Sequence, residues 1–203
     1  ALYDEIEQTF GLRLPELEYG PGLPVPYFDG DDFTDTLAPA RALAPALQEA
    51  AGWAHLTVEM GRFYTAECGF YLTTAMDCKD HDGQHYCIVD GGMNHLNYLG
   101  QIMGMKRPHL RHLAAQQGTQ EDWTLCGSLC TTNDVLVRSI SLTGLQPGDL
   151  LAFENAGAYS VTEGLGLFLS RDLPQIVLWQ NGAPQLVRGF TPTHPLNTPL
   201  GGL

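Results

Sequence analysis

The chain has 203 residues, a formal net charge of −13 at pH 7 and an isoelectric point of about 4.7. This acidity excludes the basic surfaces that bind nucleic acids or anionic membranes, while 44% hydrophobic residues suffice for a folded core. No apolar run approaches the roughly 18 residues that cross a bilayer. The first residues do not resemble a signal peptide and include no initiating Met, so we expect the chain to begin inside a longer protein.

Five cysteines occur at irregular spacing, and this odd number does not suit a disulfide framework. Cys126 and Cys130 are separated by three residues and no second pair follows, which does not match the spacing of a structural zinc site. We therefore expect reduced thiols, no bound metal ion and a cytoplasmic location.

The first third of the chain alternates between predicted helices and strands. Residues 2–10 suit the end of a helix, and residues 33–51 have apolar side chains at helical spacing, with Pro45 predicting a kink or break. Short strands are expected at residues 17–19 and 55–59. A strand, a helix and a second strand form a βαβ unit, the building block of a parallel sheet or barrel.

After residue 62 the composition becomes typical of strands. Residues 63–76 are rich in Tyr, Phe, Thr and Leu, which favour strands, and the polar residues 77–85 predict a turn. Residues 114–122 suggest a polar surface excursion, and residues 192–203 a tail with Pro and Gly. Further strands are expected at residues 86–90, 135–141, 150–154 and 176–178. This part therefore predicts a mainly antiparallel β domain.

Residues that could contact a phosphate follow the predicted strand at 55–59. Gly61 lets the backbone approach a phosphate closely and Arg62 can neutralise it, although a loop glycine beside a surface arginine would have the same sequence. Glu59 is either an exposed carboxylate or a group that faces a site at the carboxyl end of the strand.

Residues at three other positions have either a purely structural or a functional interpretation. Gly20 and Gly22 form either a simple turn or a second phosphate loop, in which Pro21 has removed one amide donor. Cys130, taken alone, would be a buried apolar residue. Tyr159 is either a core aromatic residue or a hydroxyl directed at a ligand.

Four short motifs occur in a fixed order: Glu59-Met60-Gly61-Arg62, Val89-Asp90-Gly91-Gly92-Met93-Asn94, Cys126-Gly127-Ser128-Leu129-Cys130-Thr131-Thr132-Asn133-Asp134 and Phe153-Glu154-Asn155-Ala156-Gly157-Ala158-Tyr159. Together they closely resemble the C-terminal half of the fold-type III pyridoxal-phosphate decarboxylases that act on diaminopimelate, ornithine and arginine. The resemblance covers roughly residues 14–190, and the run 150–171 is most similar to the diaminopimelate branch.

The resemblance implies pyridoxal 5′-phosphate as the cofactor. In the family motif Glu-Pro-Gly-Arg, the Glu keeps the pyridine nitrogen protonated, and the ring can then accept electrons when the substrate loses carbon dioxide. This role is carried over to Glu59. The other residues that the resemblance assigns to cofactor binding are Gly20, Gly22, Gly61, Arg62 and Tyr159.

The resemblance also implies a catalytic role for Cys130. In the family this Cys crosses the dimer interface, lies over the cofactor of the partner subunit and helps to protonate the carbon that loses carbon dioxide. Thr131, Asp134 and Tyr159 are assigned to substrate binding. The implied assembly is a homodimer with shared active sites.

The sequence departs from the family pattern at several positions. Met60 replaces a Pro, and Thr131 replaces the Glu or Asp that helps to choose the substrate, a hydroxyl being a weaker partner for a distal ammonium. His95 and neutral residues stand where the family has an Arg-Pro that binds the far carboxylate of the substrate. Arg107 or Arg111 could replace that arginine, and His95 remains a candidate site residue.

The lysine that carries the cofactor in the family is also missing, because Lys79 and Lys106 are the only lysines and neither has the expected context. We expect an α/β part followed by an all-β part. Residues 1–64 would be the C-terminal portion of a (β/α)8 TIM-like barrel, its last βαβ unit, and residues 65–203 a mainly antiparallel β-barrel or sandwich domain. This piece alone is predicted to be inactive.

Decarboxylation of meso-diaminopimelate to L-lysine is the leading functional hypothesis. Ornithine, a carboxylated polyamine or a carrier-linked amino acid remain open as substrates, because of Thr131 and the missing arginine. A non-catalytic homologue that acts through its dimer face remains open as a different class of function.

Overall fold

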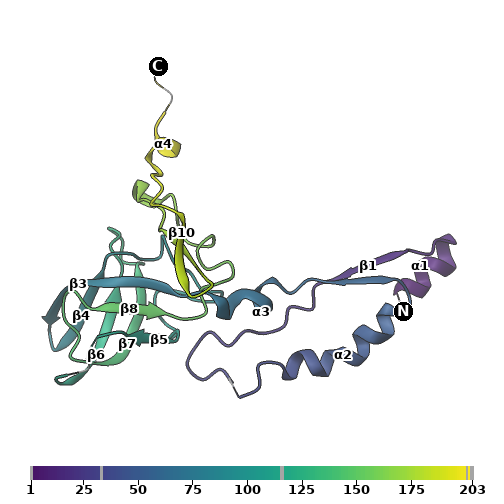
Figure 1. Ribbon diagram of the computed structural model, residues 1–203, viewed down its shortest axis with the longest axis horizontal. Coiled ribbons are helices and arrows are strands. Elements are labelled where there is room, and N and C mark those ends of the chain that lie inside the picture. The colour runs from purple at the N-terminus through teal and green to yellow at the C-terminus, as the bar shows by residue number, and fades with distance from the viewer. Residues whose placement is uncertain (1, 33, 115–116, 200, 202–203) are drawn as a thin grey trace. The chain divides into compact units, whose positions relative to one another are not determined.

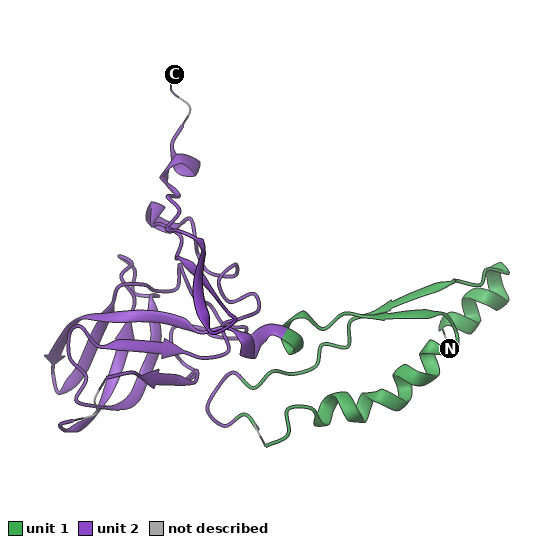
Figure 2. Cartoon of the chain, viewed as in Figure 1, with its two compact units in different colours: residues 1–26, 31–64 green, residues 27–30, 65–203 purple. Residues whose placement is uncertain are grey.

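The computed structural model describes residues 2–32, 34–114, 117–199 and 201 (Figure 1). The chain divides into two compact units, one made of residues 1–26 and 31–64 and the other of residues 27–30 and 65–203 (Figure 2). Parts of the predicted helix, excursion and tail, namely residues 33, 115–116, 200 and 202–203, lie outside the described residues. Within the described ranges, every helix is too short or too polar to span a membrane.

The first unit contains a βαβ arrangement. α1 (Leu2–Phe10) is followed by β1 (Glu16–Tyr19), α2 (Ala38–Ala51) and β2 (His55–Val58). β1 and β2 pair in parallel, with Glu16 opposite His55 and Tyr19 opposite Val58. The carboxyl ends of the two strands therefore lie at the same edge.

α2 does not break at Pro45, which lies inside it. Proline has no N–H to donate to the carbonyl of Arg41, so one intrahelical hydrogen bond is missing. The helix nevertheless continues on both sides of this position, and the prediction of a break there was wrong.

The second unit is built on a six-stranded sheet with the strand order β5-β8-β3-β4-β6-β7. Its strands are β3 (Tyr71–His81), β4 (Gln84–Val89), β5 (Leu110–His112), β6 (Gln120–Cys126), β7 (Val135–Thr143) and β8 (Leu150–Phe153). β4 and β6 pair in parallel, and the other neighbouring strands pair antiparallel. The prediction of a mainly antiparallel β domain is confirmed.

The core of the sheet comes from side chains that alternate along its strands. On β6, Trp123 and Leu125 are buried while Thr124 and Cys126 are only partly so, as the two-residue period of a strand requires. The largest fully buried apolar side chains of the sheet are Val89, Leu125, Val137, Leu151 and Phe153. This core supports the loops that leave the strands.

β3 and β4 form a hairpin whose turn consists of Asp82 and Gly83. Their φ angles are 50° and 75°, as a two-residue type I′ turn requires, and Asp-Gly is a preferred pair for it. The turn predicted over residues 77–85 was therefore too long, because β3 extends to His81 and β4 begins at Gln84. Polar residues are tolerated here because this end of the hairpin is exposed.

The strand predicted from residue 63 begins later than expected. Residues 61–65 form α3 (Gly61–Thr65) and residues 66–68 form a 3₁₀ turn, η1 (Ala66–Cys68), before β3 begins. The Gly157 N–H donates to the Ala66 carbonyl at 2.9 Å, and a Cβ built on Gly69 would lie 2.4 Å from the Gly157 Cα. This close backbone contact outweighs the strand propensity of the aromatic residues.

β9 (Ile176–Gln180) and β10 (Ala183–Arg188) form a separate antiparallel hairpin. β5, β6 and β10 were not predicted, and the excursion expected over residues 114–122 was too long, because β6 begins at Gln120. Pro184 lies within β10 and is tolerated there because the hairpin has only two strands, so β10 is an edge strand. η2 (Phe168–Ser170) precedes this hairpin, and α4 (His194–Asn197) lies in the segment that was predicted to be a tail.

Candidate active site

Residues of two sequence motifs meet at the carboxyl edge of β1 and β2. The Glu59 N–H donates to the Tyr19 carbonyl at 3.0 Å, and a Cβ built on Gly20 would lie 3.6 Å from the Glu59 carbonyl oxygen. The fold thus joins the loop after β1 to the loop after β2. The predicted residues in these two loops are Gly20, Gly22, Glu59, Gly61 and Arg62.

The loop after β1 is open and has the backbone of a glycine turn. Gly22 has a φ of 63°, in the left-handed region that glycine adopts without strain. Among the described residues, nothing lies within 4 Å of a Cβ built on Gly22. Pro21 has no amide hydrogen, so Gly20 and Gly22 supply the backbone donors of this loop.

Gly61 and Arg62 begin α3 directly after the same edge. The Tyr64 N–H donates to the Met60 carbonyl at 3.1 Å, so the helical turn forms with Met60 in place of the family proline. Gly61 is exposed and Arg62 is half-buried. Arg62 thus follows Glu59 by three residues in the chain.

Glu18 is a second carboxylate at this edge that the sequence analysis did not single out. It pairs with Thr57 on β2, two residues before the position opposite Glu59. A hydrogen bond with the Glu59 side chain, together with the charge of Glu59, raises the pKa of Glu18. Thr57 and Glu59 lie on one face by the two-residue period of the strand, and the register between the strands, which the sequence alone does not give, places Glu18 on that face too.

Residues 126–134 link β6 to β7 through a tight turn, here named the Cys130 segment. The Thr131 N–H donates to the Leu129 carbonyl at 2.8 Å, and the Asp134 N–H donates to the Thr131 carbonyl at 3.2 Å. Leu129 is buried, Thr131 is half-buried and Cys130 is exposed. The turn therefore presents the Cys130 thiol at the surface of the second unit, with Thr131 beside it.

Asp134, at the end of the Cys130 segment, is buried with 2% of its surface exposed. Its Oδ1 atom accepts the Met93 N–H at 2.7 Å, and its Oδ2 atom accepts the Leu129 N–H at 2.8 Å. Burial raises the pKa of this carboxyl, and the two backbone hydrogen bonds partly oppose the rise. Both carboxylate oxygens thus have partners in the chain itself.

His95 is held between a tyrosine hydroxyl and the backbone. Its Nε2 atom lies 2.8 Å from the Asp172 carbonyl and donates to it, so Nδ1 accepts from the Tyr71 hydroxyl at 3.2 Å. Burial lowers the pKa of His95 and favours this neutral form. Both ring nitrogens are therefore occupied by contacts within the second unit.

Arg107 and Arg111, the candidates for the missing arginine, both form ion pairs. The Arg107 Nε atom lies 3.1 Å from the Asp29 carboxylate, and Arg111 contacts the Glu154 carboxylate. Both arginines are largely exposed, and exposed pairs contribute only about 0 to 1 kcal/mol. Either side chain could therefore exchange its present partner for an anionic ligand.

Tyr159 lies in the loop after β8. Its side chain is 47% exposed, and its carbonyl accepts the N–H groups of Thr162 and Glu163, both at 2.9 Å. The chain turns at this point and leaves the ring at the surface. Tyr159 is therefore not the core aromatic residue that the plain interpretation required.

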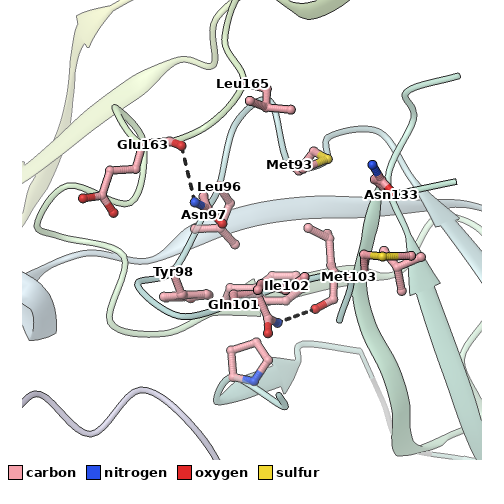
Figure 3. Close-up of a pocket in the computed structure, with 14 residues that line it drawn as sticks. Met93, Leu96, Asn97, Tyr98, Gln101, Ile102, Met103, Asn133, Glu163 and Leu165 are labelled. Carbon is pink, nitrogen blue, oxygen red and sulfur yellow. Dashed lines mark hydrogen bonds between the residues drawn. The ribbon is translucent and has the colours of Figure 1, made fainter. Parts of the chain in front are cut away.

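A cavity of about 310 Å³ lies between the loop after β4 and the sheet (Figure 3). Its apolar lining includes Leu96, Ile102 and Leu136, while the Asn97 and Gln101 side chains donate to backbone carbonyls at its wall. Among the described residues its lining does not include Cys130, Thr131 or Tyr159. The cavity is therefore separate from the predicted site residues.

The fold and motifs correspond to one class of protein, the pyridoxal-dependent decarboxylases. Residues 2–157 match the family described as "Pyridoxal-dependent decarboxylase, C-terminal sheet domain", and the chain belongs to this family. The resemblance inferred from the four motifs is confirmed, and members of the family are pyridoxal-phosphate enzymes.

Two curated relatives have similar identity to the chain. The L-glutamyl-[BtrI acyl-carrier protein] decarboxylase of Niallia circulans is 29% identical over 194 residues, covering 90% of this chain and 45% of the relative. The diaminopimelate decarboxylase of Escherichia coli K12 is 29% identical over 195 residues, covering 88% of this chain and 46% of the relative. The chain thus spans about half the length of the curated relatives it matches.

The chain is also similar to a solved structure of a decarboxylase. A crystal structure of diaminopimelate decarboxylase superposes with a TM-score of 0.75 at 27% identity, covering 96% of this chain and 52% of that chain. The similarity therefore extends over both units and is not confined to the sheet.

Proposed function

We propose that the natural protein containing this chain is a pyridoxal-phosphate-dependent amino-acid decarboxylase. The observation that carries the proposal is that the glycine loop after β1 meets Glu59 at the carboxyl edge of β1 and β2, and that Gly61 and Arg62 follow Glu59 directly in the chain. Backbone amides and a guanidinium at this strand edge can donate to a phosphate, and the Glu59 carboxylate can accept from a protonated ring nitrogen. Membership of the family supports the same assignment.

The residues at this edge fit the cofactor. Gly22 and Gly61 are exposed and can bring backbone N–H groups close to phosphate oxygens, and Arg62 would neutralise the phosphate charge. Glu59 would accept a hydrogen bond from the protonated ring nitrogen, and Glu18, whose pKa is raised by Glu59, would donate a hydrogen bond to Glu59 when it holds a proton. When bound, the cofactor supplies the electron sink for breaking the bond to carbon dioxide.

The second unit would supply the residue that donates a proton after carbon dioxide is lost. Cys130 is exposed on a turn held by backbone hydrogen bonds, so its thiol is available to reacting atoms outside its own unit. In a homodimer, Cys130 would hold a proton for the carbon that loses carbon dioxide at the site of the partner subunit. Thr131 and Tyr159, with their exposed or half-buried hydroxyls, would contact the substrate.

The first unit would be the last part of a (β/α)8 barrel. In such barrels the active site lies at the carboxyl ends of the strands, which is where Gly20 and Glu59 lie here. The lysine that carries the cofactor would come from an earlier barrel strand, because neither Lys79 nor Lys106 belongs to this edge. The 203-residue piece alone would then be inactive.

The leading substrate is meso-diaminopimelate, which would give L-lysine and carbon dioxide in the cytoplasm. Diaminopimelate decarboxylase is the recurring name among the similar proteins. Arg107 and Arg111, whose present ion pairs are exposed, are the cations available in the second unit for the far carboxylate.

A carrier-linked amino acid is the second candidate, and Thr131 is the observation that favours it. A hydroxyl at this position suits a substrate without a distal ammonium better than a carboxylate would. His95, in the segment where the family's arginine is missing, is already bonded to Tyr71 and Asp172. The relative that acts on a glutamyl-carrier protein has the same overall similarity to this chain.

The test is release of carbon dioxide by the full-length protein with pyridoxal phosphate, on meso-diaminopimelate and on glutamyl-carrier protein. Release that falls sharply in Cys130→Ala would support both the activity and the site. The absorbance spectrum of the bound cofactor in Glu59→Gln should shift toward the form with an unprotonated ring nitrogen. A protein that binds no pyridoxal phosphate and releases no carbon dioxide would contradict the proposal.

A further inference from the structure

The Asp134 carboxylate joins two segments that are far apart in sequence. One oxygen accepts from Met93, in the turn after β4, and the other accepts from Leu129, directly before Cys130. The Gly127 N–H also donates to the Asp134 carbonyl at 2.9 Å. One residue therefore ties the start and the end of the Cys130 segment to each other and to the 90–94 turn.

The space around this carboxylate is shaped by two glycines. A Cβ built on Gly92 would lie 2.5 Å from Asp134 Oδ2, and one built on Gly127 would lie 2.1 Å from the same atom. Such distances are far below van der Waals contact, so any other residue at either position would displace the carboxylate. The glycines at these two motif positions are therefore explained by Asp134.

A second set of contacts holds the same segment to the same turn. The Ser128 N–H donates to the Gly91 carbonyl at 2.7 Å. The Ser128 hydroxyl lies 3.3 Å from the Asp90 carbonyl and 3.0 Å from a guanidinium nitrogen of Arg171. The 90–94 turn thus acts as a support against which residues 127–129 are fixed.

We propose that Asp134 is a positioning residue that fixes the Cys130 thiol, and that it does not bind the substrate. The inference rests on the proposed function of Cys130. With 2% of its surface exposed and both oxygens bonded to backbone N–H groups, Asp134 has no side available for a substrate ammonium. Its charge is instead used to hold two N–H donors that lie on different segments.

Asparagine is the informative replacement because it keeps the shape of the side chain. It has one acceptor oxygen and an NH₂ group, so one of the two backbone N–H groups would face a donor. The link to Met93 or the link to Leu129 is then lost, and the Cys130 segment is released at one end. Displacement of a reacting group by about 1 Å can cost roughly 100-fold in rate.

The experiment compares full-length wild type, Asp134→Asn, Cys130→Ala and the double variant for turnover of meso-diaminopimelate. We expect Asp134→Asn to lower kcat by about 10-fold to 100-fold with KM changed less than about twofold. The double variant should be no slower than Cys130→Ala, because Asp134 acts through the thiol. Asp122→Asn, an exposed replacement in the same sheet, should leave kcat unchanged.

A second readout does not require activity. Alkylation of Cys130 by N-ethylmaleimide, followed by peptide mass spectrometry, should change in rate at least about threefold in Asp134→Asn, because a loosened segment no longer holds the exposed thiol in one environment. The exposed Cys68 is the internal reference and should react at an unchanged rate. If wild type does not act on meso-diaminopimelate, the proposed substrate fails, and the alkylation rates alone decide the role of Asp134.

Three results would overturn the inference. A raised KM with kcat retained would make Asp134 a substrate contact, as the family resemblance implies. Losses that add in the double variant, or an unchanged alkylation rate, would mean that Asp134 acts independently of Cys130. If Asp134→Asn does not fold, Gly92→Ala is the replacement variant. The added Cβ would lie 2.5 Å from Asp134 Oδ2 and would displace the same carboxylate from the 90–94 turn.

Discussion

The His112 Nε2 atom lies 2.8 Å from the Asp149 Oδ2 atom, and both side chains are buried. The same carboxylate oxygen accepts the Gln146 N–H at 3.0 Å. His112 ends β5 and Asp149 precedes β8, so this contact joins two neighbouring strands at one end of the sheet. The pair thereby stabilises the edge of the sheet from which the loop before β8 leaves.

His112→Ala should destabilise the protein, because it leaves the buried Asp149 carboxylate without its side-chain partner. Removal of one partner of such a pair costs about 3 kcal/mol or more, which corresponds to a fall of roughly 6 to 12 °C in Tm for a domain of this size. Thermal unfolding of the full-length protein measures this. His81→Ala, at the exposed hairpin tip, is the control and should change Tm little.

Asp134 should give stability a dependence on pH that is opposite to that of a typical paired carboxylate. Its pKa is raised in the folded state, mainly by burial, so the folded protein holds the proton at pH values where the unfolded chain, at about 3.9, has lost it. The free energy of unfolding of wild type, relative to Asp134→Asn, should therefore fall as pH rises from about 4 and then level off. Urea midpoints of both proteins between pH 3.5 and 7 test this, and a relative gain with rising pH would contradict it.

Gly127→Ala should disturb the Cys130 segment from within. Its Cβ would lie 2.1 Å from the Asp134 carboxylate, and overpacking of this kind costs typically about 1 to 3 kcal/mol. Both Tm and kcat should fall. Gly189→Ala is a matched control, because nothing described lies within 4 Å of a Cβ there. Equal effects of the two substitutions would argue against a special constraint at Gly127.

The sheet and the order of the motifs could be predicted because they depend on local patterns. β4, β7, β8 and β9 overlap the strands predicted from apolar and β-branched residues. β6 was missed, because its first residues, Gln120–Asp122, are polar. The boundaries were harder to predict. Phe63, Tyr64 and Thr65 have strand propensity but belong to a helical turn, in which the Tyr64 N–H donates to the Met60 carbonyl.

The structural role of Asp134 could not be predicted from the sequence, because it depends on a contact with a distant part of the chain. A carboxylate at this motif position is equally consistent with a ligand contact and with a backbone anchor. The difference depends on the Met93 N–H, which lies 41 residues away. Glu18 is a similar case, since its place beside Glu59 depends on the register between β1 and β2.

Arg62→Ala should weaken binding of pyridoxal phosphate to the full-length protein. Loss of a charge-assisted hydrogen bond costs about 1.5 to 3 kcal/mol, a rise in Kd of roughly 10-fold to 150-fold. Titration of the cofactor-free protein, followed by absorbance, measures the Kd. Arg41→Ala removes an equal charge from the exposed face of α2, where the arginine pairs with Asp35. A similar loss in that variant would indicate a general electrostatic effect.

Thr131→Glu should change the choice of substrate. A carboxylate beside Cys130 can form a charge-assisted hydrogen bond with a distal ammonium, which the threonine hydroxyl can do only weakly. We expect kcat/KM for meso-diaminopimelate to rise about 10-fold, as one such bond contributes about 1.5 kcal/mol. The activity on glutamyl-carrier protein should not rise, because a glutamyl group has no distal ammonium. Thr132→Glu adds the same charge at the next, exposed position, and an equal rise there would mean that the charge alone, not its contact with the substrate, attracts diaminopimelate.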